Sequence, residues 1–278
     1  TDAGPEKIAR VRARVPHEGI GAKILNNQGS DGAWHRPDEP DWLPTLFMPQ
    51  LLRVAGPDPA DPAVASAMTR LNAGFRWHED FGAKPFFDGE VEPCINGRTI
   101  ETGAHFGVDV APIVERILGE RLQDGGWNCE AENGSVRTSF DTTINVLDGL
   151  VEFERATGGS AEVSAARRGG EEYLLERNLF RRKSNGDVVN PDYLEFAFPY
   201  YWHYDVLRAL DYFRGAGTSP DPRMAEAVDV VRSKRQPDGR WLLDHIYPGR
   251  VYFDLEEVGA PSRWNTLRAL RVLDWWDR

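Results

Sequence analysis

The sequence has few cysteines, few cations relative to anions, and no long apolar run. Two cysteines in 278 residues are too few for a disulfide scaffold. The net charge of −11 argues against broad nucleic-acid binding and against attraction to an anionic membrane surface. No apolar run approaches the roughly 18 residues of a membrane span, and the first residues lack the apolar core of a signal peptide. We therefore expect a cytoplasmic globular protein with no integral membrane span.

Tryptophan, in contrast, is abundant, and three of the nine tryptophans lie in stretches that share a pattern. Each stretch has a glutamine, a short turn with Asp-Gly or Gly-Gly, and then the tryptophan. The three copies are "NQGSDGAWH" (27–35), "LQDGGWNCE" (122–130) and "RQPDGRWLL" (235–243). Their spacing suggests a repeat of roughly 50 residues. We therefore expect two weaker copies between them, at 81–90 and 180–189.

Helical periodicity flanks these turns, with apolar residues at three- and four-residue steps. A charged amphipathic segment precedes each turn, and a more apolar segment follows it. Such hairpins must stack on their neighbours, as a superhelix or a closed ring with the apolar helices inside. We predict a single all-α domain, 1–278, of about five helical hairpins, with one candidate β-hairpin at 244–257. The charged segments are 6–15, 61–75, 111–122, 161–180 and 221–235, and the apolar ones are 41–54, 94–107, 139–154, 200–214 and 262–276.

The glutamine–glycine–tryptophan turns resemble the QW repeats of the squalene and oxidosqualene cyclases. The β-subunits of the protein prenyltransferases are related to these enzymes and share the same fold. The resemblance implies an α/α toroid, in which the glutamine caps a helix end and stacks on the tryptophan of a neighbouring repeat. The residue types suit that role, because glycine permits the positive φ of a tight turn, an amide satisfies orphan backbone groups and an indole buries a large area.

The resemblance also implies a central cavity lined by the starts of the inner helices. Three such starts align: Phe140-Asp141-Thr142, Tyr204-Asp205-Val206 and Trp264-Asn265-Thr266. The triterpene cyclases protonate an alkene or epoxide with a DxDD motif, of which only Asp141 remains here. Asp141 is either a catalytic acid, held protonated by burial, or a cap or polar lining group. In the catalytic interpretation, His203 and Asp205 orient or relay protons.

Other residues would line this cavity. Aromatic faces can stabilise carbocations, although these rings can equally be ordinary core residues. Asn96, Arg98 and Arg263 would bind an anion near helix N-termini, or the arginines would pair with inner carboxylates. Asn265 completes the polar lining. The aromatic candidates are Trp42, Phe47, Trp202, Tyr204 and Trp264.

The two cysteines, Cys94 and Cys129, would lie at the same rim of a ring. Two thiolates with a histidine make a zinc site with an open fourth position, but a disulfide or buried thiols also fit. The candidate histidines are His105, His203 and His35, with His105 first. The prenyltransferase zinc set is not carried over, because Trp264-Asn265-Thr266 stands where that family has Tyr-His-Thr.

Three functions follow as hypotheses. The first is an isoprenoid (terpene) cyclase-like enzyme that needs no cofactor and starts proton-initiated chemistry on a hydrophobic, prenylated substrate. The second is a zinc-dependent lyase, hydrolase or cyclase that uses Cys94 and Cys129 with a histidine. The third is a non-catalytic toroid that binds a lipid or a partner protein, since a fold does not fix a function. Substrate, product and oligomeric state are not set by the sequence.

Overall fold

A computed structural model describes residues 4–247 and 255–278 of the chain. This part is mostly α-helical, which confirms the predicted all-α class. None of the described helices is long and apolar enough to cross a membrane. The middle of the predicted hairpin at 244–257, residues 248–254, lies outside the described residues. The described strands are β1 (Trp241–Leu242) and β2 (Pro261–Ser262), which pair antiparallel with Trp241 opposite Ser262.

The helices alternate along the chain as the sequence predicts. A first helix, α1 (Pro5–Arg14), precedes them and matches the predicted segment 6–15. The helix that leads into the first tryptophan turn is a further one, α2, which the periodicity did not indicate. The helices before the turns are α2 (Gly19–Asn26), α4 (Pro62–Gly74), α6 (Ala111–Gly119), α8 (Ala161–Leu175) and α10 (Ala225–Ser233); those after them are α3 (Trp42–Ala55), α5 (Pro93–His105), α7 (Phe140–Thr157), α9 (Val206–Gly215) and α11 (Arg263–Trp276).

Short 3-10 helices fill the connections. They are η1 (Glu79–Phe81), η2 (Phe86–Asp88), η3 (Cys129–Ala131), η4 (Pro191–Leu194) and η5 (Pro222–Met224). Within the described residues, the chain divides into two compact units. Unit 1 holds residues 4–120 and 148–164, and unit 2 holds 121–147, 165–247 and 255–278. Helices α7 and α8 contribute residues to both units. The single domain and the closed ring remain predictions of the sequence.

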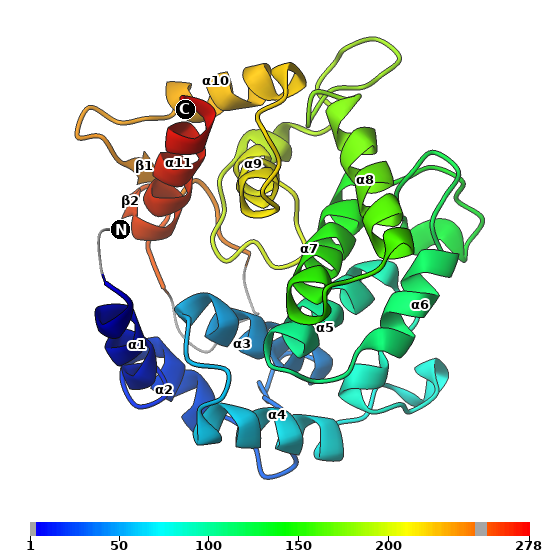
Figure 1. The fold of residues 1–278 in the computed structure, drawn as a ribbon, viewed down its shortest axis with the longest axis vertical. Coiled ribbons are helices and arrows are strands. Elements are labelled where there is room, and N and C mark those ends of the chain that lie inside the picture. Colours follow the sequence, from blue (N-terminus) through cyan, green and yellow to red (C-terminus); the bar gives the residue numbers. More distant parts are fainter. Residues whose placement is uncertain (1–3, 248–254) are drawn as a thin grey trace. The chain divides into compact units, whose positions relative to one another are not determined.

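Unit 1 is built around α3 and α5. Helix α3 packs against α2 and α5, and α5 packs in turn against α6 (Figure 1). Every residue of α3 from Leu43 to Leu52 is buried. The helix ends at Gly56, whose φ of 77° is the left-handed conformation that favours glycine at a helix C-terminus. Local sequence also starts α4, where the Asp61 side chain accepts the Ala63 N–H and Pro62 follows at the first helical position.

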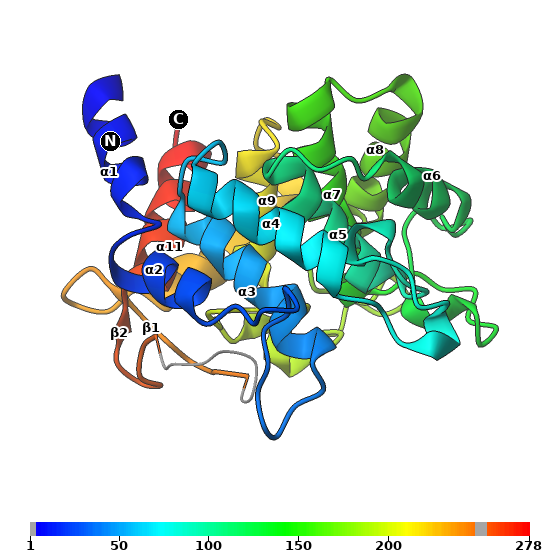
Figure 2. The same cartoon turned by 90° about the horizontal axis from the view of Figure 1, so that it is seen from below.

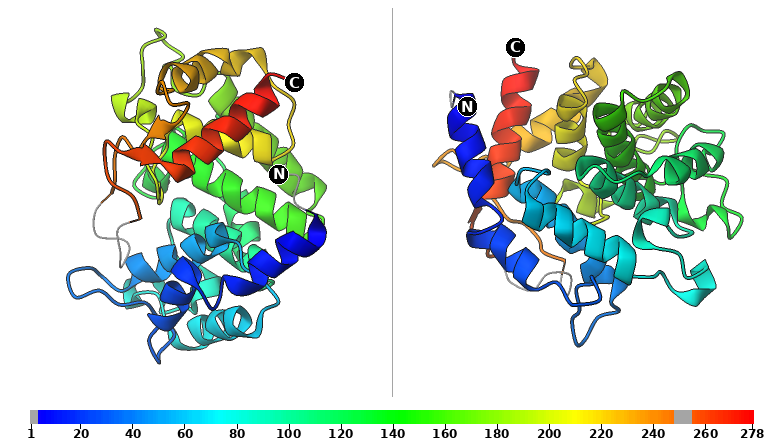
Figure 3. Two further views of the ribbon diagram at one scale, coloured as in Figure 1. Left: turned by 90° about the vertical axis from the view of Figure 1, so that its left-hand side faces the viewer. Right: turned by 60° about the horizontal axis from the view of Figure 1, so that its bottom comes forward.

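Unit 2 is built around α9 and α11. These two helices pack on each other, and α10 packs against both (Figure 3). The strand pair lies against the start of α11 (Figure 2). Helices α9 and α11 both have side-chain caps, since Asp205 accepts the Arg208 N–H and Ser262 accepts the Asn265 N–H. Unit 2 therefore holds the starts of α9 and α11, as well as the start of α7, which are the positions singled out by the sequence.

The three strong tryptophan turns share one hydrogen-bonded frame. Each tryptophan is fully buried, and the turn before it contains a glycine with positive φ, at 85°, 110° and 84° for Gly32, Gly125 and Gly239. The backbone N–H of each tryptophan donates to a threonine hydroxyl in the first turn of the next helix. These pairs are Trp34 with Thr45 (3.0 Å), Trp127 with Thr143 (3.2 Å) and Trp241 with Thr266 (3.0 Å).

The frame also explains the glycine requirement. A Cβ atom at Gly125 would lie 2.7 Å from the carbonyl oxygen of Gly169, so any larger residue must displace the backbone there. The two weaker copies lack the tryptophan but keep parts of this frame. In 81–90, Gly89 has a φ of 75°, and the Glu90 N–H donates to the Asn96 side chain in the first turn of α5 at 2.9 Å. In 180–189, Gly186 has a φ of 77°, and the Arg182 N–H closes the turn on the Asp187 carbonyl at 2.7 Å, as the Leu122 N–H does on the Gly126 carbonyl at 2.8 Å. The strong copies are therefore structural, and the weaker ones are partial versions of the same turn.

Candidate functional site

Asp141 is held by two donors from outside its own helix. The Tyr193 hydroxyl donates to Oδ2 at 2.8 Å, and the Tyr204 backbone N–H donates to Oδ1 at 2.8 Å. Asp141 therefore joins the first turn of α7 to the segment that leads into α9, and it is not the cap of α7 that one interpretation expected. Both carboxyl oxygens of Asp141 therefore act as hydrogen-bond acceptors.

The phenols around Asp141 are buried and stay protonated. Burial, together with the charge of Asp141, raises the pKa of Tyr193 and of Tyr204 above the ordinary value. The Tyr204 hydroxyl donates to the Leu179 carbonyl at 2.5 Å. The ring of Phe140 packs edge-on against Tyr204, with centroids 5.2 Å apart, and the two tyrosine rings are 4.8 Å apart. Aromatic rings thus surround the donors that fix Asp141.

Asp205 follows Tyr204 in the chain, and its surroundings differ from those of Asp141. Its side chain is 2% exposed and caps α9, with the Arg208 N–H donating to Oδ1 at 2.7 Å. The other oxygen, Oδ2, has no hydrogen-bond partner among the described residues. Burial raises the pKa of Asp205, against the opposing charges of Arg268 and Arg208. Of the two aspartates, Asp205 is therefore the one whose surroundings favour the protonated acid.

Two buried arginines flank Asp205. The guanidinium carbons of Arg208 and Arg268 lie 4.3 and 5.0 Å from the ring centroid of Tyr200. Arg268 approaches Asp205 with Nη2 at 3.9 Å from Oδ1. Arg208 donates to the Asn145 side chain at 2.9 Å, and Asn145 donates in turn to the Trp202 carbonyl at 2.7 Å. This polar network fixes the segment 200–205 to α7 and α9.

Half-buried aromatic side chains lie next to this network. The rings of His203 and Tyr247 are stacked, with centroids 3.5 Å apart, and Trp202 packs against His203 at 4.9 Å. Trp264 is stacked on Phe198 at 4.5 Å. Burial raises the pKa of Tyr247, and the charges of Asp205 and Asp141 raise it further. Half-buried aromatic rings therefore pack on His203, two residues before Asp205.

The remaining predicted cavity residues have other roles. Asn265 is buried and donates to the carbonyls of Phe196 and Leu242, at 3.0 and 3.1 Å. Arg263 is exposed beside Glu256. Four of the predicted residues belong to unit 1, whereas Asp141 and Asp205 belong to unit 2: Trp42, Phe47, Asn96 and Arg98. Trp42 is half-buried at the start of α3, and Phe47 is buried. The Asn96 side chain accepts the backbone N–H of Glu90 and donates to its carbonyl.

Arg98 has the carboxylate partners that its alternative interpretation expected. Its Nε and Nη2 donate to the Gln50 side-chain oxygen at 2.8 and 2.5 Å. Its Nη1 lies 2.7 Å from Glu101 and 3.3 Å from Asp148. Arg53 also pairs with Glu101. Arg98 is thus the centre of a buried ionic network in unit 1.

The same network accounts for His105. Its Nδ1 lies 2.8 Å from Glu152. Burial opposes ionisation of Glu152, but the hydrogen bond with His105 and the charge of Arg53 together lower its pKa to about 2. His105 ends α5, whereas Cys94 begins it, so the two are separated by roughly 16 Å of helix. The prediction that His105 shares a metal with Cys94 is therefore wrong, because the helix holds them apart.

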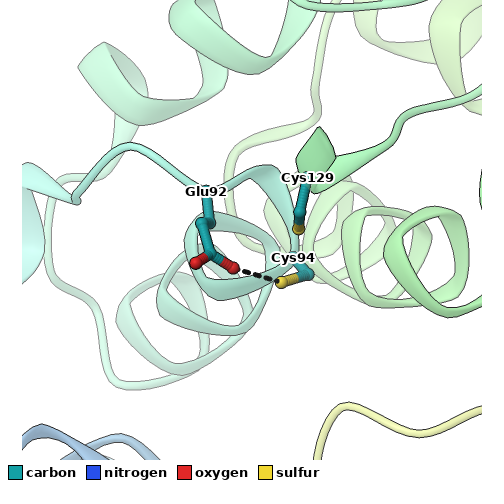
Figure 4. Close-up of side chains that lie close together, drawn as sticks. All are labelled: Glu92, Cys94 and Cys129. Carbon is teal, nitrogen blue, oxygen red and sulfur yellow. Dashed lines mark hydrogen bonds between the residues drawn. The ribbon is translucent and has the colours of Figure 1, made fainter. Parts of the chain in front are cut away.

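The thiol of Cys94 has an acidic neighbour. Figure 4 shows it directed toward the carboxylate of Glu92, with Sγ 3.5 Å from Oε2. In unit 2, the Cys129 thiol accepts a hydrogen bond from the Thr142 hydroxyl at 3.5 Å. A metal site with both cysteines would join the two units, and it remains a prediction of the sequence.

The third candidate histidine, His35, lies 2.9 Å from both Asp31 and Asp41.

Glu90 precedes Cys94 by four residues and is buried, with 2% exposure. It accepts the backbone N–H groups of Val91 and Glu92 at 2.6 and 2.8 Å, yet burial raises its pKa to about 7 from 4.5. The folded state therefore binds this proton more tightly than the unfolded state does. The stabilisation that it provides is complete below about pH 4.5 and is lost as the pH rises through about 7.

We expect Glu90→Gln to remove this pH dependence. Between pH 4.5 and 8, the free energy of unfolding of the wild type should fall by roughly 3 kcal/mol more than that of the variant. Glutamine retains an oxygen that can accept a backbone N–H group. Urea titrations at several pH values measure the difference. Parallel pH profiles for the two proteins would contradict the assignment.

Some residues of the unit 2 cluster escaped the sequence analysis. A signal for two of them was present, since "DVLRAL" (205–210) and "NTLRAL" (265–270) place Arg208 and Arg268 three residues after the aligned Asp205 and Asn265. Tyr193, Tyr200 and Tyr247 carry no such signal, because Tyr193 lies in the short 3-10 helix η4 and the other two lie in irregular segments between helices.

Comparison with models of known protein families finds no match, and no curated protein matches the chain. The function must therefore be argued from the geometry of the site. Within unit 2, a hydrogen bond joins Asp141 to Tyr204, which precedes Asp205 in the chain, and Arg208 of α9 donates to the His203 carbonyl. Trp202 packs on His203, and its carbonyl accepts a hydrogen bond from Asn145 of α7.

Proposed function

We propose that unit 2 carries the catalytic centre of an isoprenoid cyclase-like enzyme, with Asp205 as the acid and Asp141 as the carboxylate. The observation that carries the proposal is the contrast between two neighbouring carboxyl groups. Asp141 accepts two hydrogen bonds, whereas Asp205 is buried with one oxygen lacking a hydrogen-bond partner among the described residues. Groups with such different surroundings commonly divide the acid and base roles of a reaction.

The chemistry begins at Asp205. Its O–H bond breaks as a C–H bond forms at the less substituted carbon of a substrate alkene, which leaves a tertiary carbocation. Attack by a second alkene closes a ring, and loss of a proton from carbon to Asp141 restores a neutral product. Asp205 regains its proton through solvent. The net change is an isomerisation, so no oxidant, reductant or cofactor is consumed.

The surroundings support a hydrophobic substrate. The half-buried rings of Trp202 and Tyr247 pack on His203, two residues before Asp205, and offer π-faces in this part of unit 2. Trp264, stacked on Phe198, adds a further half-buried ring. Such faces attract positive charge without reacting with it. Tyr193 keeps Asp141 in place, and Arg268, 3.9 Å from Asp205, offsets the charge that this carboxyl group acquires when it gives up its proton. The roles differ from the sequence hypothesis, in which Asp141 was the acid.

The test is conversion in D2O. The purified chain is incubated with squalene, geranylgeraniol or farnesol, and the products are analysed by gas chromatography and mass spectrometry. Protonation at carbon predicts a cyclic product that carries deuterium from solvent, and chelation with EDTA should leave the rate unchanged. Absence of conversion for all three probes, or products without deuterium, would contradict the proposal. Loss of activity with EDTA and recovery with Zn²⁺ would favour the zinc hypothesis instead.

A further inference from the structure

Helix α1 differs from the other helices of unit 1, because none of its residues is buried. Ile8 and Val11 are 44% and 54% exposed, which places them among the most exposed large apolar residues in the described chain. The helix is also strongly basic, with four cations and the single anion Glu6, although the whole chain has a net charge of −11. Figure 2 shows α1 leading away from α2.

The apolar and basic residues of α1 form adjacent stripes. Ile8, Val11 and Val15 follow each other at three- and four-residue steps, so they share one face. The cations Lys7, Arg10 and Arg14 have the same spacing, one position earlier, and so border that face. This order of residues, an apolar stripe with a basic margin, is typical of helices that lie in the interface of a membrane.

The helix is held in a defined orientation. Arg12 donates from Nε to the Gly56 carbonyl at 3.3 Å and from Nη2 to the Pro57 carbonyl at 2.8 Å. Arg14 pairs with Glu18 at 2.6 Å. Lys7 and Arg10, in contrast, form no ion pair with any described residue. Their charges are therefore available to an external partner on the same side as Ile8 and Val11.

We propose that α1 binds the anionic surface of a lipid bilayer. Ile8 and Val11 enter the interface, while Lys7 and Arg10 contact the lipid phosphates and carboxylates. The negative charge of the rest of the chain does not prevent this, because charges more than about 8 Å away are largely screened at physiological ionic strength. The proposal does not depend on the catalytic assignment in unit 2.

Vesicle co-sedimentation of the full chain tests it. The chain should bind vesicles of phosphatidylcholine with phosphatidylserine, bind vesicles of phosphatidylcholine alone much less, and dissociate as salt is raised. Replacing Lys7→Gln and Arg10→Gln together should lower the partition coefficient roughly 25-fold, at about fivefold for each charge near the surface. Ile8→Ser with Val11→Ser should also lower it. All four side chains are exposed, so the fold should persist in circular dichroism.

Helix α11 provides the matched control. Leu267 and Leu270 are 40% and 45% exposed and have the same three-residue spacing as Ile8 and Val11. Changing both to serine should leave vesicle binding unchanged. The proposal is overturned if the chain ignores the anionic vesicles, or if the α1 and α11 variants lose binding equally. Self-association that needs Lys7 and Arg10, without vesicle binding, would overturn it in favour of a second copy as the partner.

Discussion

Asp205→Asn is expected to lower kcat for the proton-initiated conversion by at least roughly a hundredfold, with little change in stability. General acid catalysis contributes about that much or more, and asparagine carries no proton that it can transfer to an alkene. Asparagine is also a good helix cap, so the hydrogen bond from the Arg208 N–H can be kept. Product formation from the probe that the wild type converts, together with thermal unfolding, measures both effects.

Asp221→Asn is the control for this substitution. Asp221 also caps a short helix, with the Arg223 N–H donating to its Oδ1 at 2.9 Å. It takes no part in the aspartate cluster, so its replacement should leave kcat unchanged. An active Asp205→Asn protein would remove Asp205 from the acid role. If the Asp205→Asn protein is inactive and also unfolded, Asp205→Glu is the variant to measure, because it restores an acid at the same position.

Arg98→Met should destabilise unit 1 by about 3–5 kcal/mol. The substitution leaves the buried Glu101 without one of its cations and removes a cation from Asp148. Loss of one member of a buried ion pair is costly because the remaining charge stays away from water. Urea denaturation at neutral pH gives the difference in the free energy of unfolding.

Two further variants separate charge from packing. Arg155→Met removes an arginine that lies on the surface and contacts Glu152 at 3.1 Å, and it should cost less than about 1 kcal/mol. Adding Glu101→Gln to Arg98→Met should recover part of the loss, because it removes the stranded charge. If the double variant is as unstable as the sum of the two single changes, Arg98 acts mainly through packing.

The helices were predictable from the sequence because their apolar residues recur at three- and four-residue steps. The segment 94–107, for example, corresponds to α5, which runs from Pro93 to His105. Helix α2 escaped prediction because it is short and contains two glycines, at Gly19 and Gly21, which weaken any helical signal. The turns at Trp34, Trp127 and Trp241 were recognised because glutamine, glycine and tryptophan recur there in the same order.

The candidate site was predictable only in part. Asp205 was found because it aligns with a helix start, but the partner of Asp141, Tyr193, lies 52 residues further along in the short 3-10 helix η4. Local patterns do not encode such a contact, since it depends on how distant segments pack. The prediction that Cys94 and His105 share a metal was wrong for the opposite reason, because a regular helix fixes the distance between them.

The bond between each turn tryptophan and its threonine has a consequence for how the chain can change over evolutionary time. The two partners are 11, 16 and 25 residues apart in sequence in the three copies, although the bond and the helix position are the same. The intervening residues are therefore free to vary in number without disturbing the scaffold. The second interval contains Cys129, and the third contains Tyr247. New binding properties can thus arise by lengthening or rewriting these intervals, while the helices that they connect stay in register.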